Sequence, residues 1–195
     1  MISLSNAVVF GWHSAIMGMR NPMNSWAKSD SVFYNDFSCQ VGQNDLDLMK
    51  TLIKAGTEHR KFLRMLHVQM DIEAPLYWWK EFETYKIGTV SNSCSTMHKI
   101  AAKEFDVNDF SHEHIEELDG DEYNMSYDWL LRTVDTLNYY RKKYNAASEK
   151  LNRDITDAER KHVLAQRKLF WWQMIQLLPS SYNQLRTVDL NYEVL

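Results

Sequence analysis

A run of small polar residues between positions 86 and 96 holds side chains suited to binding a ligand. The segment reads KIGTVSNSCST and offers one ammonium group, several hydroxyls, an amide and a thiol. Such groups, together with backbone N–H groups, bind phosphates and the polar edges of nucleotides. The segment therefore indicates a phosphate or nucleotide site, although its composition also fits a solvated loop. The candidates are Lys86, Ser91, Asn92, Ser93, Cys94, Ser95 and Thr96.

The residues before this segment predict the elements that position it. Leu66, Val68, Met70 and Ile72 alternate with polar residues, which predicts a strand with one apolar face. Pro75 then suits a first helical turn, and PLYWWKEFETYK reads as an amphipathic helix. We therefore expect a strand and a helix that deliver residues 87–96 as a polar loop.

The rest of the chain reads as a mixture of strands and helices. A short strand is predicted at 3–12, ended by Gly11, and a helix follows at 13–19. Asn44 is a suitable N-cap and Gly56 a suitable C-terminal residue for a helix between them. Apolar residues at helical spacing predict further helices at 123–144, 157–178 and 180–195, with a polar connector at 145–154.

Length and composition limit the classes of protein. The 195 residues, 45% of them hydrophobic, fit one soluble domain over positions 1–195. A formal net charge of −4 gives no electrostatic reason to expect nucleic-acid binding. No apolar run reaches the ~20 residues that a membrane helix needs, and two cysteines form no disulfide framework. We therefore expect a cytoplasmic protein without a membrane or nucleic-acid partner.

Two polar clusters leave alternatives open. His112, His114 and Glu116 would align on a strand and could hold a metal, whereas on a helix starting after Ser111 they diverge. We expect no metal there. Arg20, among asparagines and serines, could contact an anion or belong to a turn.

Two stretches resemble the flavin-dependent thymidylate synthases, the ThyX family. One is LMKTLIKAGTEHRKFLRMLHVQMDIEAPLYWWKEFETYK, and the other is LLPSSYNQLRTVDLNYEVL. The family has a helix ending in Gly, a strand reading apolar-x-Ala-Pro, and a helix leading to Arg-His-Arg and then Ser-x-Arg. A Leu-Pro turn and an Asn-x-Arg helix come later. The similarity covers roughly 45–85 and 176–195 in the family's order, and the wording around YWWKEF resembles phage-encoded relatives.

The resemblance implies a fold and a function. The implied fold is α+β, with a central, mainly antiparallel sheet flanked by helices, assembled as a homotetramer. The implied activity is one-carbon transfer to deoxyuridine monophosphate (dUMP) and reduction, with flavin adenine dinucleotide (FAD) as cofactor. NADPH and methylenetetrahydrofolate would be co-substrates, and the location would be the cytoplasm, or the host cytoplasm for a phage-encoded protein.

The residues at the family's motif positions differ from the family pattern. Thr84, Tyr85 and Lys86 stand where the family has Arg-His-Arg, so only one charge is kept. Cys94-x-Thr96, or one residue later Ser95-x-Met97, stands where the family has Ser-x-Arg. Asp189-x-Asn191 replaces Asn-x-Arg, and Met65 falls where the family has a flavin-contacting His. Lysine does not replace arginine at a bidentate site. Arginines elsewhere could replace the missing ones: Arg20, Arg60, Arg64 and Arg186.

The resemblance assigns site residues by position. Thr84, Tyr85 and Lys86 fall at cofactor-binding positions. The nucleotide would be bound by Lys86, Ser91, Asn92, Ser93, Cys94, Ser95, Arg186 and Asn191. Cys94 could also act as a nucleophile if a cation lowered the pKa of its thiol, and the alternative is a small buried residue.

Three functions remain open at this point. The chain could be an active flavin-dependent enzyme, a homologue that binds a nucleotide without catalysis, or a structural or regulatory oligomer. The final helix would run out without a stop signal. We therefore expect either a copy truncated at its C-terminus or a frayed last helix.

Overall fold

The structure, a computed structural model, describes residues 2–115 and 125–195. The chain forms two compact units, which are described separately. The sheet unit comprises Ser3–Glu73, Lys80–Ser93 and Leu185–Leu195. The helical unit comprises Met1–Ile2, Ala74–Trp79 and Cys94–Gln184.

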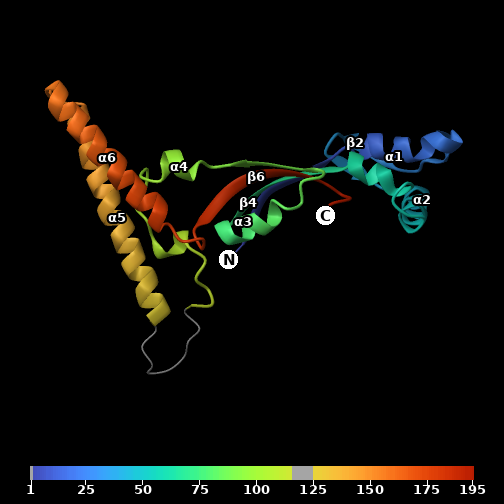
Figure 1. Cartoon of the computed structure of the whole chain (residues 1–195). Coiled ribbons are helices and arrows are strands. Elements are labelled where there is room, and N and C mark those ends of the chain that lie inside the picture. Colours follow the sequence, from blue (N-terminus) through green and yellow to red (C-terminus); the bar gives the residue numbers. More distant parts are fainter. Residues whose placement is uncertain (1, 116–124) are drawn as a thin grey trace. The chain divides into compact units, whose positions relative to one another are not determined.

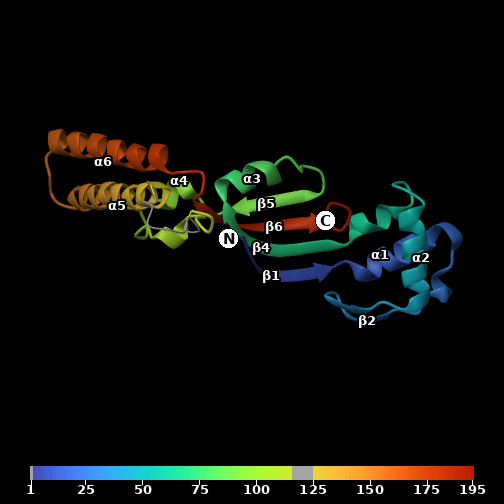
Figure 2. The ribbon, with the colours of Figure 1, turned by 90° about the horizontal axis from the view of Figure 1, so that it is seen from below.

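A four-stranded sheet forms the centre of the sheet unit (Figure 2). Its strand order is β1-β4-β6-β5, and the pairs β1–β4 and β5–β6 are antiparallel. The expected α+β fold with a mainly antiparallel sheet is therefore confirmed. The strands are β1 (Ser3–Phe10), β4 (His67–Pro75), β5 (Thr89–Ser93) and β6 (Asn183–Asn191), and α3 (Leu76–Phe82) follows β4.

Strand β4 has the apolar face that the sequence predicts. Leu66, Val68 and Ile72 are buried, whereas Gln69 on the opposite face is exposed. Such alternation is what a strand with one covered face requires. The predicted strand at 66–72 is confirmed.

Two predictions about secondary structure are wrong. Residues 180–195 form strand β6 in place of a helix, and the expected loop at 87–96 contains strand β5. In β6, Gln184, Val188 and Leu190 are buried at even spacing, as in a strand, and Asn191 is buried at its last position. The neighbouring strands β4 and β5 supply backbone partners on both sides of β6, and this tertiary pairing outweighs the helical spacing of a few apolar residues.

Helices pack around a separate apolar cluster in the sheet unit. Helix α1 (Trp12–Arg20), helix α2 (Gln43–Lys54) and the 3-10 helix η3 (Arg60–Met65) contribute to this cluster, and β2 (Val32–Asn35) forms a hairpin with β3 (Ser38–Gln40). Further 3-10 helices are η1 (Asn21–Met23) and η2 (Trp26–Lys28). The buried members are Ala15, Ile16, Met19, Met49, Phe62 and Leu66.

The N-terminus of α2 is capped differently from the prediction. The cap residue is Gly42, so the prediction of Asn44 as N-cap is wrong. Asp30 supplies the missing acceptors, since its carboxylate accepts hydrogen bonds from the N–H groups of Asn44 at 3.0 Å and Asp45 at 3.2 Å. A distant residue in the sequence thus satisfies the free N–H groups of the first turn.

A buried ion pair joins α1 to α2. The Arg20 Nε group donates to Asp45 Oδ1 at 2.6 Å, and the two side chains are 4% and 0% exposed. The other carboxylate oxygen accepts from the hydroxyls of Ser29 at 2.7 Å and Ser31 at 2.6 Å. Arg20 is therefore committed to the core, and the alternative in which it contacts an anionic ligand gains no support.

The helical unit is built on two long helices that lie side by side (Figure 1). These are α5 (Met125–Leu151) and α6 (Asp157–Leu177), with short elements α4 (Thr96–Lys99) and η4 (Val107–Asp109) beside them. Their buried cluster consists of Ile100, Phe105, Phe110, Leu130, Val134, Leu137 and Met174.

The sequence locates α6 well and α5 only in part. A capping box of Thr156 and Glu159 starts α6, and the helix ends within one residue of the prediction. Helix α5 continues through most of the predicted connector, because Ala147 is buried and Asn145 donates to the Ala101 carbonyl at 3.4 Å. The predicted start of this helix at Tyr123 lies outside the described residues. Within the described part of the chain, no helix has both the length and the apolar character needed to cross a bilayer.

We predict that Asp45→Asn strongly destabilises the protein. The substitution would leave the buried Arg20 guanidinium without its counter-charge, and breaking a buried pair in this way costs about 3–5 kcal/mol. Denaturant unfolding at pH 7 measures the change. The exposed Asp47→Asn variant on the same helix should stay within about 0.5 kcal/mol of the wild type.

The same pair predicts a dependence of stability on pH. Burial raises the pKa of Asp45, but hydrogen bonds from Ser31, Ser29 and Arg20 outweigh it, so the pKa lies below its ordinary value. The charged carboxylate therefore stabilises the fold above its ordinary pKa, and this stabilisation is lost as the pH falls through the folded-state pKa. The difference between wild type and Asp45→Asn should shrink on acidification, and a difference independent of pH would contradict the assignment.

Candidate functional site

Thr84, Tyr85 and Lys86 form the turn that ends α3. The Thr84 hydroxyl donates to the Glu81 carbonyl at 2.7 Å, and the Tyr85 N–H donates to the Phe82 carbonyl at 3.1 Å. The hydroxyl of Thr84 thus stabilises the helix end. The Lys86 side chain is exposed, and its ammonium makes no ion pair with any residue that the structure describes.

Strand β5 presents the polar run along the edge of the sheet. Ser93, Asn92 and Ser91 pair with Arg186, Thr187 and Val188 of β6, and all three β5 side chains are exposed. Directly opposite residues of an antiparallel pair lie on the same face. Ser91 and Ser93 therefore share the face of Arg186, and Asn92 lies on the other face. The strand brings three members of the predicted group together, but on two sides of the sheet.

Arg186 is already paired within the sheet unit. Its Nη1 group donates to the Glu83 carboxylate, and its side chain is 12% exposed. This interaction joins β6 to the end of α3. Arg186 was predicted to bind the nucleotide, and in this structure its charge is balanced by a carboxylate of the same chain.

The remaining arginines proposed as replacements are paired as well. Arg60 and Arg64 both donate to the Glu193 carboxylate, with an Arg60 Nε to Oε1 distance of 3.4 Å. The hydrogen bond from Arg64 is the main reason that the pKa of Glu193 lies below its ordinary value. With Arg20 bound to Asp45, each arginine considered as a replacement has a carboxylate partner.

Asn191, the last residue of β6, has a structural role where the end of β6 pairs with the start of β5. Its N–H donates to the Gly88 carbonyl at 3.2 Å, and its Oδ1 accepts from the Glu193 N–H at 3.1 Å. Gly88 has a φ of +74°, and a Cβ at this position would lie 2.2 Å from Asn191 Nδ2. The buried Asn191 side chain therefore needs a glycine at position 88.

Cys94, Ser95 and Thr96 belong to the helical unit. The Gln184 Nε2 group donates to the Cys94 carbonyl at 2.8 Å and to the Thr96 hydroxyl at 3.0 Å. Ser95 caps α4, with its Oγ accepting from the His98 N–H at 3.2 Å. The Cys94 thiol is exposed, so the alternative of a small buried residue is wrong.

Several residues in this region were missed from the sequence. His67 Nδ1 lies 2.8 Å from Asp189 Oδ1, Gln69 donates to Asp189 Oδ2 at 3.0 Å, and Thr187 donates to Asp71 at 2.6 Å. These bonds cross between β4 and β6 on the polar face of the sheet. The alternation of polar residues in both strands would have located them, had 183–191 been recognised as a strand.

The metal alternative gains no support. Glu116 lies outside the described residues, and His112 Nδ1 lies 2.7 Å from the Phe110 carbonyl. Among residues 2–115 and 125–195, no group of three or more His, Cys, Asp or Glu side chains is arranged to hold a metal ion.

Comparison with known proteins gives a match in structure only. No model of a known protein family matches the sequence, and no curated protein matches it either. Two crystal structures of the flavin-dependent thymidylate synthase ThyX from Helicobacter pylori, with FAD and dUMP, are similar in fold. One has 15% identity and a TM-score of 0.54, covering 96% of this chain and 79% of that chain. The other has 13% identity and a TM-score of 0.55, covering 100% and 79%.

A third similar structure is a UMP/dUMP methylase, PolB from Streptomyces cacaoi, bound with 5-Br dUMP. It has 13% identity and a TM-score of 0.52, covering 100% of this chain and 74% of that chain. At such identities the similarity establishes the fold, which is that of the ThyX structures. This agrees with the fold that the sequence resemblance implied.

We predict that Gly88→Ala destabilises the sheet unit more than Gly56→Ala. Both glycines have positive φ, so alanine costs about 1–2 kcal/mol at either position. A Cβ at Gly56 meets nothing within 4 Å, whereas a Cβ at Gly88 clashes with Asn191. Overpacking of this kind adds about 1–3 kcal/mol. Denaturant unfolding of both variants measures the difference, and equal losses would contradict the contact.

Proposed function

We propose that the protein binds a pyrimidine mononucleotide, dUMP, through the polar segment that begins at Lys86. The supporting observation is an edge strand with exposed hydroxyl and amide groups beside a lysine without a carboxylate partner. The fold that carries this strand is shared with proteins crystallised with dUMP or its 5-bromo analogue. Hydrogen bonds to a charged phosphate are the strong contacts in such a site.

The residues suggest a division of roles. Lys86 would pair with the phosphate, and Ser91 and Ser93 would donate hydroxyl hydrogen bonds from the same face of β5. Asn92, on the other face, offers an amide that can both donate and accept. An exposed edge strand also has backbone N–H and C=O groups free to bind a ligand.

A more specific proposal is that the protein carries out the flavin-dependent reaction on dUMP. This proposal is supported by the fold alone. FAD, NADPH and methylenetetrahydrofolate would enter with it, as would assembly into a homotetramer. FAD carries two phosphates, which cationic side chains or backbone N–H groups at helix N-termini bind. At the positions matching the family's motif, Thr84 is bonded to its own helix, and Lys86 is the one cationic side chain. Thr84, Tyr85 and Lys86 do not fit a flavin diphosphate as they stand.

A second candidate is a nucleotide-binding protein that has lost catalysis. The specific observation in its favour is that Arg20, Arg60, Arg64 and Arg186 are all paired with carboxylates of the chain. Charged hydrogen bonds to the uracil carbonyls would favour hydride attack on the ring, and guanidinium groups suit that task. Paired arginines are less able to perform it.

Calorimetric titration with dUMP, combined with a visible absorption spectrum, tests both candidates. We expect dUMP to bind in the micromolar range or tighter. A protein-bound flavin band that shifts on addition of dUMP would favour the flavin-dependent enzyme. Nucleotide binding by a colourless protein that does not take up FAD would favour the binding protein. Absence of dUMP binding at millimolar concentration would contradict the proposal.

We also predict that Lys86→Ala weakens dUMP binding about ten- to hundredfold. The loss corresponds to one charge-assisted hydrogen bond, worth about 1.5–3 kcal/mol. The matched control is Lys80→Ala, because Lys80 is exposed on α3 and its substitution removes the same charge. Affinity unchanged in Lys86→Ala, or an equal loss in both variants, would show that the effect does not come from a specific contact.

A further inference from the structure

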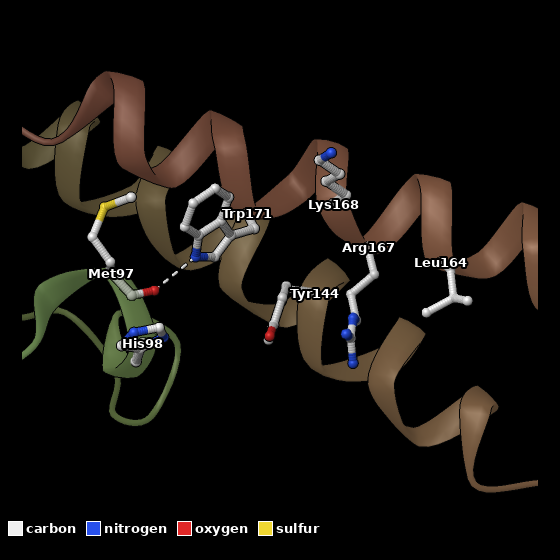
Figure 3. A pocket seen from close by; sticks show the side chains of 7 residues that line it. All are labelled: Met97, His98, Tyr144, Leu164, Arg167, Lys168 and Trp171. Carbon is white, nitrogen blue, oxygen red and sulfur yellow. Dashed lines mark hydrogen bonds between the residues drawn. The ribbon is translucent and has the colours of Figure 1, made fainter.

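A groove on the helical unit combines cationic and aromatic side chains (Figure 3). We call it the α6 groove. It has a volume of about 400 Å³ and lies where α4, α5 and α6 meet. The side chains that matter most are His98 of α4, Tyr144 of α5, and Arg167, Lys168 and Trp171 of α6. Volumes of this size are typical of sites for small ligands.

Packing holds the walls of the groove in place. The Trp171 indole N–H donates to the Met97 carbonyl at 2.9 Å, which joins α6 to α4. The Arg167 guanidinium lies over the Tyr144 ring, 5.7 Å from its centroid, which joins α6 to α5. Arg167 and Trp171 are four residues apart and therefore share one face of α6. The cation and the flat indole are thus placed on the same wall.

The charge of this groove is not balanced by carboxylates. Neither Arg167 nor Lys168 forms an ion pair with a residue that the structure describes. Between Glu159 and the end of α6, the sequence has Arg160, Lys161, His162, Arg167 and Lys168 but no Asp or Glu. The arginines of the sheet unit differ, since Arg60, Arg64 and Arg186 are paired with carboxylates. In a protein of net charge −4, this concentration of positive charge favours an anion.

A further arginine, Arg141, lies on the neighbouring helix α5. The Arg141 Nε group is buried and has no hydrogen-bond partner among the described residues. Arg141 precedes Tyr144 by three positions on α5, so the two residues lie on adjacent turns of one face. Buried donors normally have an acceptor. Arg141 does not line the α6 groove, but it adds a further positive charge to the helix that carries Tyr144.

We propose that the α6 groove binds a small phosphate monoester that carries a flat ring. The Arg167 guanidinium would bind the phosphate oxygens, because a planar fork of N–H donors matches their geometry, and the Lys168 ammonium would add positive charge nearby. The His98 imidazole would offer a further N–H donor, and the Trp171 indole would contact the ring of the ligand. Nucleoside monophosphates belong to this class. This proposal does not depend on dUMP binding at the segment that begins at Lys86, and it holds whether or not the α6 groove also binds dUMP.

The test uses phenyl phosphate and inorganic phosphate as probes in calorimetric titrations, with phenol as the uncharged comparison. We expect phenyl phosphate to bind more tightly than inorganic phosphate, and phenol not to bind measurably. Arg167→Gln should lower the affinity for phenyl phosphate at least tenfold. Lys161→Gln is the matched control, since Lys161 is exposed on the same helix outside the groove and loses the same charge.

Two further measurements separate binding from folding. Lys168→Gln removes an exposed charge, so it should fold normally and weaken phenyl phosphate binding several-fold. The indole N–H resonance of Trp171, assigned with Trp171→Phe, should shift on titration with phenyl phosphate. No binding of phenyl phosphate to the wild type would overturn the proposal. So would wild-type affinity in both Arg167→Gln and Lys168→Gln, or a loss in Lys161→Gln equal to theirs.

Discussion

The pairing of β5 with β6 is the contact on which the rest of the structure depends. Ser93 lies opposite Arg186, and the segment between them in the chain contains both long helices. Such a long connection is entropically costly to close, so the strands must gain enough from their hydrogen bonds and from the packing of β6 to offset it. The same pairing places Gly88 against Asn191 and joins Glu83 to Arg186. The polar edge strand exists only because this pairing forms.

Local patterns in the sequence predicted the helices and strands that depend on nearby residues. They did not predict features that depend on residues far away in the chain. The alternation around Val68 and Ile72 predicted β4, and apolar residues at helical spacing predicted α6. Strand β6 was read as a helix because the spacing of Leu185, Val188 and Tyr192 fits a helical face, whereas β4 and β5 are what select a strand. Helix α2 was likewise capped by Asp30, which lies outside its own segment.

The candidate site likewise combines features that the local sequence predicts with contacts that only the fold creates. The sequence correctly identified an exposed polar run with Lys86, but it gave no sign of which arginines are paired. Glu83 with Arg186, and Glu193 with Arg60 and Arg64, are pairs separated by more than a hundred positions. Only the fold brings their charges together. Conversely, the unpaired cations of α6 are close in sequence, but their groove forms only when α4 and α5 pack beside them.

Positively charged side chains have two different roles in the two units. In the sheet unit, guanidinium groups stabilise the fold by binding carboxylates of the chain, and Lys86 stays exposed beside β5. In the helical unit, Arg167 and Lys168 face a groove without a carboxylate partner among the described residues. In the sheet unit the arginines thus serve stability, and the proposed nucleotide site depends on Lys86 and the polar groups of β5. A crystal structure of the protein grown with dUMP tests this most directly. The account predicts a nucleotide whose phosphate contacts Lys86 and whose other polar atoms contact residues of β5. A structure at saturating dUMP in which no nucleotide contacts residues 86–96 would contradict it.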